Sequence, residues 1–487
     1  MTQESFLIID AGSGSVKSFL VSPQGDLLKS SEQIWNRNTW NSNLAWIKIT
    51  ESIKELTENY EGEILGVTST SMREEFILLD EKGEEINYTL SDESKKIGKE
   101  ILKEFGEELY QKSGHWPVPN WIAGAIIPCL KITQPDLFER IQSILMLSDW
   151  INYRLTGELA TESSGACETS LFDITTADWS WENIQKLDLP RHICPEVLKN
   201  GEILGDIDEK ISKLTGVSEY VPVIMGGADT QCGLIGMGIK TCEYAAVGGT
   251  TTPIQLITDK PLIDEEKRTW SNNHVVEGEW ILESNAGYTG RAVKWLRDTF
   301  FKEKEGYNEL NHSVKKVAIG SDGLLTYLGP HLFDAGPPYW STDKLSNLPV
   351  EPCIIGSHSF NIPILARAIF EANSYAVRRN VEQLETISGI DLDYLNFCGG
   401  NSKSDFWMQI QADVLGKPVH VPLVNDSTAV GAAILASIGT GYYSTLDKAV
   451  NNMVNQGKVF EPRKSSNKKY DKHYMRWIKT REKLGKL

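Results

Sequence analysis

The chain has 487 residues, of which 40% are hydrophobic and 24% charged, so it has the composition of a globular protein and is too long for one core. Its formal net charge of −17 argues against nucleic acid or an anionic membrane as the main partner. No apolar run approaches the ~20 residues needed to cross a bilayer, and the first residues lack a signal-peptide pattern, so we expect a cytoplasmic protein.

The seven cysteines and eight histidines are scattered along the chain. No two cysteines form a Cys-x-x-Cys pair, and no histidines have a metal-type spacing. We therefore expect reduced thiols in place of disulfides or zinc, and we assign no structural metal.

Residues 5–34 alternate apolar strands with glycine-containing turns and predict a β-meander. The first turn holds Gly12, Ser13 and Gly14 and follows Asp10 at the end of a strand. This turn is not a dinucleotide-binding fingerprint, because the third glycine is missing and a strand follows in place of a helix.

Arg73 and Glu74 lie between a short apolar strand and a predicted hairpin at 76–86. They are either a solvated rim or a pair that binds vicinal hydroxyls, because a guanidinium donates and a carboxylate accepts hydrogen bonds. Trp121, in the loop after a helical region at 90–112, belongs to the core or stacks on the C–H face of a sugar. The residues alone favour the solvated rim for Arg73 and Glu74, and they leave both choices open for Trp121.

The stretch 221–252 places an acid and a glycine-rich loop in quick succession. An apolar strand and three small residues precede Asp229, and Thr230 and Gln231 then open a helix of small residues. A second strand runs into Gly248-Gly249-Thr250-Thr251-Thr252, which offers backbone N–H groups and hydroxyls to a polyphosphate. Taken singly, these residues are better explained as an N-cap aspartate and a β-turn, because both are common.

Two strand–turn–strand units, at 6–22 and 244–257, share this design and lie roughly half a chain apart. We therefore predict an internal duplication in which each half contributes one phosphate loop, with domains at 1–252 and 253–487. The second half further predicts a hairpin at 274–284, helices at 290–301 and 362–384, and a strand–glycine turn–helix–strand unit at 395–422.

Four motifs recur in a fixed order, and together they resemble the FGGY family of carbohydrate kinases over about residues 5–450. They are Asp10-x-Gly12-x-Gly14-x-x-Lys17, Gly227-Ala-Asp229-Thr-Gln231, Gly249-Thr250-Thr251, and Cys398-Gly399-Gly400-x-Ser402-Lys403-Ser404. The resemblance implies an α/β fold of two duplicated ribonuclease-H-like domains of the actin and hexokinase type. It also implies that the N-terminal domain holds the sugar and the catalytic base, that the C-terminal domain binds the nucleotide, and that Mg-ATP lies in the cleft between them.

Roles for individual residues follow from the same resemblance. Asp229 is the expected general base, and Asp10 with Asp229 is expected to hold Mg²⁺. The expected acceptor-binding residues are Arg73, Glu74, Trp121, Asp229 and Gln231. The expected ATP-binding residues are Gly12, Ser13, Gly14, Lys17, Gly249, Thr250, Thr251, Gly290, Lys294, Gly399, Gly400 and Ser404.

Shorter sequence segments narrow the choice of acceptor. The Arg73-Glu74 pair resembles glycerol kinases and autoinducer-2 kinases of the family, whereas xylulose-type kinases carry a Gln/Met-His-Gly motif there. Residues 71–86, 145–179 and 293–300 resemble the autoinducer-2 subgroup more closely. We expect ATP-dependent phosphorylation of a small sugar, polyol or sugar-like quorum-sensing signal, with no nucleic acid or membrane partner and a homodimer left open. A catabolic xylulose- or glycerol-type kinase, a non-catalytic sugar-sensing regulator and an actin-like ATPase are the alternatives.

Overall fold

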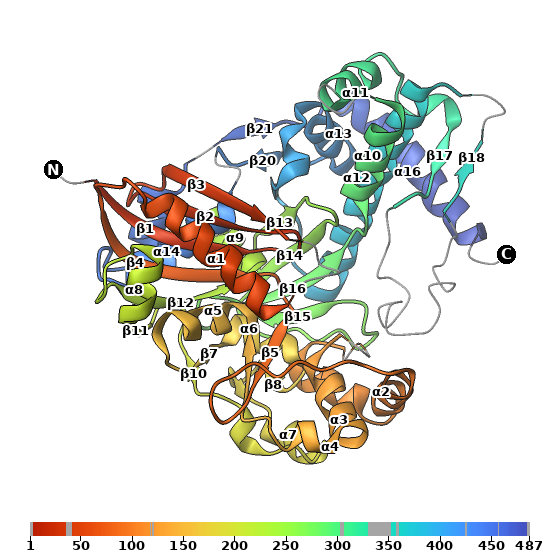
Figure 1. Cartoon of the computed structure of the whole chain (residues 1–487). Coiled ribbons are helices and arrows are strands. Elements are labelled where there is room, and N and C mark those ends of the chain that lie inside the picture. Colours follow the sequence, from red (N-terminus) through yellow and green to blue (C-terminus); the bar gives the residue numbers. More distant parts are fainter. Residues whose placement is uncertain are drawn as a thin grey trace.

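The computed structural model describes residues 3–35, 41–116, 118, 121–301, 306–329, 352–356, 360–423, 426–455 and 457–484. Two β-sheets, each covered by helices, form the two halves of the molecule (Figure 1). Within the described part of the chain, no helix combines the length and apolar character that a membrane span requires. All seven cysteines are free thiols.

The first sheet has the strand order β11-β12-β4-β1-β2-β3. Strand β1 pairs antiparallel with β2 and parallel with β4, and β4 pairs parallel with β12, so the predicted meander is one half of a mixed sheet. In the order given, the strands are Ile203–Asp206, Pro222–Ala228, Glu63–Ser71, Glu4–Ala11, Ser15–Val21 and Leu27–Ile34.

The second sheet has the order β15-β16-β14-β13-β19-β20-β21. Strand β13 pairs antiparallel with β14 and parallel with β19, and β19 pairs parallel with β20. These strands are Trp270–Asn273, Trp280–Asn285, Pro253–Thr258, Tyr244–Val247, Leu395–Cys398, Val419–Val421 and Lys458–Phe460.

The two sheets share one topology, which confirms the predicted duplication. The run β3-β2-β1-β4-β12 corresponds, strand by strand and with the same directions, to β16-β14-β13-β19-β20. The turn between β1 and β2 is therefore equivalent to the turn between β13 and β14, and each lies at the same end of the strands in its own sheet.

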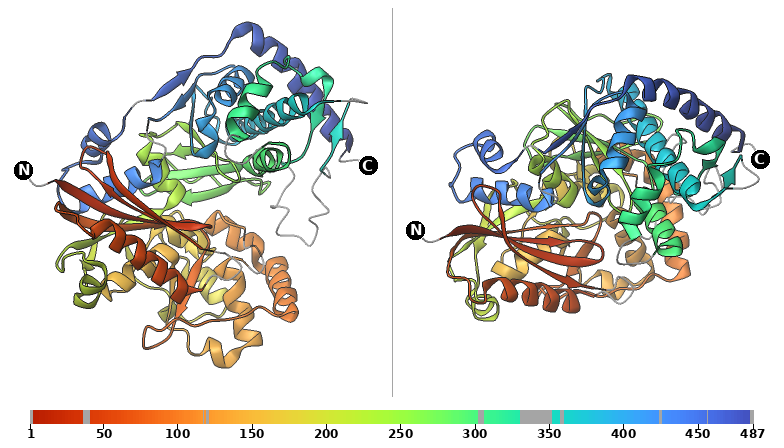
Figure 2. Two further views of the ribbon diagram at one scale, coloured as in Figure 1. Left: turned by 45° about the horizontal axis from the view of Figure 1, so that its top comes forward. Right: turned by 90° about the horizontal axis from the view of Figure 1, so that it is seen from above.

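Helices cover both faces of the first sheet because β1 buries alternate residues on opposite sides. Leu7 and Ile9 pack with α1 (Ser42–Thr57) and α5 (Leu147–Thr156). Phe6 and Ile8 pack instead with α14 (Ser427–Gly439), which comes from the second half of the chain. The long α12 (Ile362–Ser388) and α16 (Lys464–Leu484) contribute to the core of the second sheet, and Figure 2 shows α16 along its outer side.

Helix α9 (Asp229–Gly236) and α14 cross between the halves. Leu234 of α9 packs with strands of the second sheet, as α14 packs with the first. Glycines permit the close crossing: a Cβ on Gly236 would lie 1.9 Å from the Ser427 carbonyl oxygen, and one on Gly431 would lie 1.8 Å from that of Cys232. The start of each helix is thereby held near the junction of the two halves.

Two expected boundaries differ in the structure, whereas the hairpin expected at 76–86 is confirmed. Leu79 forms an antiparallel bridge with Glu85, and the Ile86 amide donates to the Leu78 carbonyl oxygen at 2.8 Å. The first strand of this hairpin, β5 (Phe76–Leu79), also pairs with β6 (Ser143–Met146). The hairpin expected at 274–284 uses Trp270–Asn273 as its first strand. A domain boundary after residue 252 would separate β13 from β14, which are neighbours in one sheet. We therefore propose a boundary between residues 236 and 244.

Candidate active site

The first glycine turn brings Asp10 and Lys17 face to face. Asp10 is the second-to-last residue of β1 and lies opposite Lys17 in the register of β1 with β2. The turn between them closes with a hydrogen bond from the Gly12 amide to the Ser15 carbonyl oxygen at 3.0 Å, and it leaves Ser13 and Gly14 exposed. Backbone N–H groups of Ser13 and Gly14 are thus accessible beside a lysine, as an anion-binding loop requires.

Asp229 is the first residue of α9, directly after β12. Its Oδ1 accepts a hydrogen bond from the Thr230 amide at 2.7 Å. Burial raises the pKa of Asp229 to about 6, although Arg73 acts in the opposite direction. Burial, followed by the charge of Asp229, raises the pKa of Asp10 to about 7, against the influence of Lys17. The charge of Asp229 therefore acts on Asp10, and the charge of Arg73 acts on Asp229.

Asp426 is a third acid of this group that the motifs did not identify. Asp426 is the residue before α14, and Asp229 is the first residue of α9. Because α14 follows β20 as α9 follows β12, the duplication places the two acids at equivalent helix starts. Asp426 lies 3.9 Å from the Lys17 Nζ, and its charge contributes to the raised pKa of Asp10. The signal in the sequence is an aspartate directly before a helix of small residues.

Asp10 and Asp229 suit a cation that takes most of its ligands from phosphate and water. Among the described residues, no three His, Cys, Asp or Glu side chains are close enough to one another to form a metal site. Mg²⁺ prefers one or two carboxylates together with phosphate and water oxygens, so Asp10 and Asp229 suit Mg²⁺ that arrives with a nucleotide. Their raised pKa values reflect repulsion and burial that such a cation would offset.

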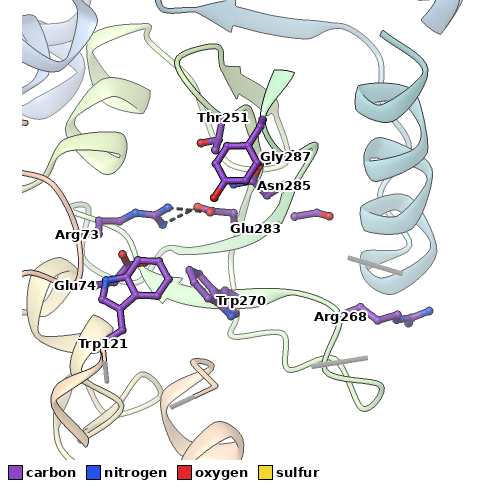
Figure 3. A pocket seen from close by; sticks show the side chains of 11 residues that line it. Arg73, Glu74, Trp121, Thr251, Arg268, Trp270, Glu283, Asn285 and Gly287 are labelled. Atoms are coloured by element: carbon purple, nitrogen blue, oxygen red, sulfur yellow. Dashed lines mark hydrogen bonds and ion pairs between the residues drawn. The ribbon is translucent and has the colours of Figure 1, made fainter. Parts of the chain in front are cut away.

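A cavity of about 190 Å³ contains three of the residues expected to bind the acceptor (Figure 3). Arg73 and Glu283 point toward each other in its lining and are joined by hydrogen bonds. The cavity is small enough to match a sugar-sized molecule, and its aromatic and polar walls suit C–H and hydroxyl groups. Its lining residues are Arg73, Glu74, Trp121, Thr251, Arg268, Trp270, Glu283, Ser284, Asn285, Gly287 and Tyr288. We call it the acceptor cavity.

Arg73 forms a two-pronged ion pair with Glu283 of β16. Its Nη1 and Nη2 donate to the Glu283 carboxylate at 2.7 and 2.9 Å, and Gln255 donates to the same carboxylate at 2.8 Å. Burial alone would lower the pKa of Arg73, but Glu283 and Glu168 raise it, so the guanidinium stays charged. Glu283 was missed in the sequence, although a glutamate inside the apolar strand Trp280–Asn285 was a signal for a buried role.

Glu168 and His115 are buried next to the Arg73–Glu283 pair. Glu168 is 3.6 Å from Nη1 of Arg73 and 3.3 Å from Nε2 of His115, which also contacts Asn272. Burial raises the pKa of Glu168 well above its usual range and lowers that of His115 to about 3. Arg73 therefore has two carboxyl neighbours, Glu283 within hydrogen-bond distance and Glu168 at 3.6 Å.

A second cavity, of about 500 Å³, contains six of the residues expected to bind ATP. We call it the nucleotide cavity. Its lining includes Gly249, Thr250, Gly290, Lys294, Gly400 and Ser404, together with Arg291, Val293, Tyr307, Asn308, Asn311, Phe370, Asn401, Lys403 and Trp407. The loop after β13, the start of α10 (Thr289–Phe300) and the turn before α13 (Asp405–Leu415) therefore share one hollow.

Close backbone packing shapes this cavity. A Cβ on Gly290 would lie 1.9 Å from the Gly249 carbonyl oxygen. Gly399 has φ of +83°, and a Cβ there would lie 2.6 Å from the Gly248 carbonyl oxygen. Asn401 Nδ2 donates to the Gly249 carbonyl at 3.3 Å. Glycine is needed at Gly290 and Gly399 because three loops meet without side chains between them.

Some expected residues lie elsewhere or have other partners. The fully buried Gln231 is outside the lining of the acceptor cavity and accepts a hydrogen bond from Thr230 at 2.6 Å. Lys294 is exposed and paired with Asp298 at 2.6 Å, and Ser404 donates to Asn311 at 2.6 Å. Thr251 lines the acceptor cavity, whereas its neighbours Gly249 and Thr250 line the nucleotide cavity.

Two family matches divide the chain where the sheets divide. The N-terminal domain of the FGGY family of carbohydrate kinases matches residues 5–236, and its C-terminal domain matches residues 244–440. The chain belongs to this family. This FGGY protein is accordingly a carbohydrate kinase, an enzyme that phosphorylates an alcohol group, and its fold is the expected pair of duplicated domains.

Relatives and solved structures agree with this assignment. The FGGY kinase is 29% identical to autoinducer-2 kinase of Salmonella paratyphi B and 27% identical to that of Escherichia coli, over 97% of this chain and 93% of each relative. It shares its fold with gluconate kinase from Lactobacillus acidophilus (TM-score 0.86, 21% identity, 99% of both chains) and with Plasmodium falciparum glycerol kinase with ADP (TM-score 0.82, 18% identity, 98% of both chains).

Proposed function

We propose that this FGGY kinase transfers the γ-phosphate of ATP to a hydroxyl of a small sugar-like molecule of the autoinducer-2 type. The observation that carries the proposal is the position of Asp229, which interacts electrostatically with Asp10 of the first phosphate loop and with Arg73 of the acceptor cavity. A base between a phosphate loop and an acceptor is what phosphoryl transfer to an alcohol needs.

Asp229 is the proposed general base. With a pKa of about 6, its carboxylate is mostly ionised at neutral pH and still basic enough to accept a proton. It takes the proton of the acceptor hydroxyl as that oxygen bonds to the γ-phosphorus and the bond to the β-phosphate oxygen breaks. The proton stays on Asp229 until product leaves, and ADP departs with the electron pair of the broken bond.

ATP is proposed to lie in the nucleotide cavity with its terminal phosphates toward Gly249 and Thr250. The loop of Gly12, Ser13 and Gly14, with Lys17, approaches the same phosphates from the other half. Mg²⁺, held by Asp10 and Asp229, would neutralise phosphate charge when bound. Lys294 and Ser404 are proposed to line the adenosine side, and Gly399 supports them by keeping the loops in close contact.

The acceptor is proposed from two independent supports. Arg73, Glu74 and Trp121 line one small cavity, and the autoinducer-2 kinases match over nearly the whole chain. A signal-processing kinase would connect the protein to quorum sensing. A xylulose- or glycerol-type kinase of catabolism is the second candidate, because a xylulose kinase and a glycerol kinase share the fold.

The test is acceptor-dependent release of ADP from Mg-ATP, with dihydroxypentanedione, glycerol, erythritol, xylulose and ribulose compared at equal concentration. We expect dihydroxypentanedione to give the highest kcat/KM. Higher turnover with a ketopentose or polyol would move the enzyme to catabolism, and absence of turnover with every acceptor, with ATP binding intact, would favour a sugar-sensing regulator.

A further inference from the structure

Both cations that line the acceptor cavity are already paired with carboxylates. Arg73 pairs with Glu283, and Arg268 pairs with Asp264 through two hydrogen bonds of 2.8 and 2.9 Å. Of the described residues that line this cavity, Arg73 and Arg268 are the cations, and Glu74 is a further acid beside Glu283. The wall therefore has no positive charge in excess.

Glu283 is held so that it cannot leave Arg73 easily. Its carboxylate accepts two hydrogen bonds from Arg73 and one from Gln255, its neighbour in register on β14. Only 3% of Glu283 is exposed. Two strands of the second half thus fix an anion against a cation of the first half.

The paired guanidinium of Arg73 can still bind uncharged groups of a ligand. The fork with Glu283 occupies two of the five N–H groups of Arg73, and the others can donate to a hydroxyl or carbonyl oxygen. A carboxylate on the ligand would instead lose its water and meet Glu283 and Glu74 without an unpaired cation, which is costly in a small and partly buried site.

We propose that Glu283 is a specificity residue that restricts the acceptor to uncharged polyhydroxy compounds and rejects sugar acids. The inference rests on the proposed function, because it assigns the acceptor cavity to the phosphorylated molecule. It also separates fold from specificity, since a gluconate kinase has the same fold at 21% identity. The charge that Glu283 places against Arg73, and not the sheet topology, decides between gluconate and its neutral counterparts.

The experiment uses pairs of ligands that differ in one group. D-glucitol and D-gluconate share a six-carbon skeleton, as glycerol and glycerate share a three-carbon one, and in each pair the acid replaces an alcohol. Affinity is measured by calorimetry and turnover by ADP release, for the wild type and for Glu283→Gln, which has the same shape without the charge. Glu277→Gln, which removes an exposed acid paired with Lys199, is the matched control.

In the wild type we expect the neutral member of each pair to bind at least ~10-fold more tightly than the acid. In Glu283→Gln the unpaired Arg73 attracts the carboxylate, so the ratio should shift toward the acid by ~10-fold or more. Glu277→Gln should keep the wild-type ratio. Equal affinity for both members in the wild type, or an unchanged ratio in Glu283→Gln, would overturn the proposal.

A second variant covers loss of folding in Glu283→Gln. The double variant Arg73→Gln with Glu283→Gln leaves no unpaired charge, so it should keep the preference for neutral ligands, and a switch to the acids would contradict the proposal. The two proposals fail separately. If no acceptor supports turnover the proposed function is wrong, while the affinity ratios still decide the role of Glu283.

Discussion

The acceptor cavity and the nucleotide cavity of this kinase are charged in different ways. In the acceptor cavity each arginine has a carboxylate partner. The nucleotide cavity is lined by Arg291 and Lys403 as well as by Lys294, which pairs with Asp298, and, among the described residues, by no acid. A chain with a net charge of −17 can therefore offer a polyphosphate a locally positive site. Local lining, and not total charge, assigns the anionic substrate to one cavity and the sugar-like substrate to the other.

The proposed base, Asp229, gives the largest expected effect. Asp229→Asn keeps the shape of the side chain but cannot accept the proton, so kcat should fall by ~10²-fold or more. Calorimetry with ATP should show affinity close to that of the wild type. Wild-type turnover in this variant would remove Asp229 from the role of base.

The nucleotide side can be disturbed by a single methyl group. Gly290→Ala would place a Cβ 1.9 Å from the Gly249 carbonyl oxygen, and the loop must move. We expect the KM for ATP to rise by ~10- to 100-fold, while the affinity for the acceptor changes little. Gly233→Ala is the control, because its Cβ would make an ordinary 3.4 Å contact with Thr428. Equal kinetics in both variants would argue against phosphates at this loop.

A substitution in the acceptor cavity should change the KM for the acceptor and not the KM for ATP. Arg73→Gln removes donors and leaves Glu283 without its cation, so the KM for the acceptor should rise by ~10-fold while that for ATP changes little. Steady-state kinetics with each substrate varied in turn separates the two constants. A larger change in the KM for ATP would place Arg73 outside the acceptor cavity.

Acid should weaken catalysis before it unfolds the site. Because Asp229 is active as the carboxylate and its pKa is raised to about 6, kcat/KM for the acceptor is retained above that pH and lost below it, to ~2-fold lower at pH 6 than at pH 8. A pH profile with controlled Mg²⁺ checks this. A flat profile down to pH 5 would contradict a base with a raised pKa.

The smallest effect is expected at Lys294. Its ammonium is exposed and paired with Asp298, so Lys294→Gln should change the KM for ATP by less than ~3-fold. A change as large as that of Gly290→Ala would mean that Lys294 leaves Asp298 to hold phosphate.

The sequence was sufficient where local structure depends on neighbours along the chain. The strand before Asp229, the glycines of both loops and the helix after Ser404 were all local patterns, and the repeat of one pattern predicted the duplicated sheets. Gly290 joined the nucleotide cavity as expected for the same reason, since it begins a helix next to a loop.

Roles that depend on distant partners were missed. Glu283 meets Arg73 across 210 positions of sequence, and nothing in the spacing of either residue records that contact. Asp426 meets Lys17 only because α14 returns to the first sheet. The pairing of β5 with β6 was missed for the same reason, because the two strands are far apart along the chain.

The fate of the γ-phosphate tests the central claim most directly. Wild-type enzyme is incubated with Mg-ATP and its best acceptor, and ³¹P NMR follows the phosphate ester and inorganic phosphate together. The account predicts one phosphate ester for each ADP formed, with inorganic phosphate at the level seen without enzyme. Inorganic phosphate formed in step with ADP, and no ester, would show an ATPase in place of a kinase whose Asp229 serves an acceptor hydroxyl.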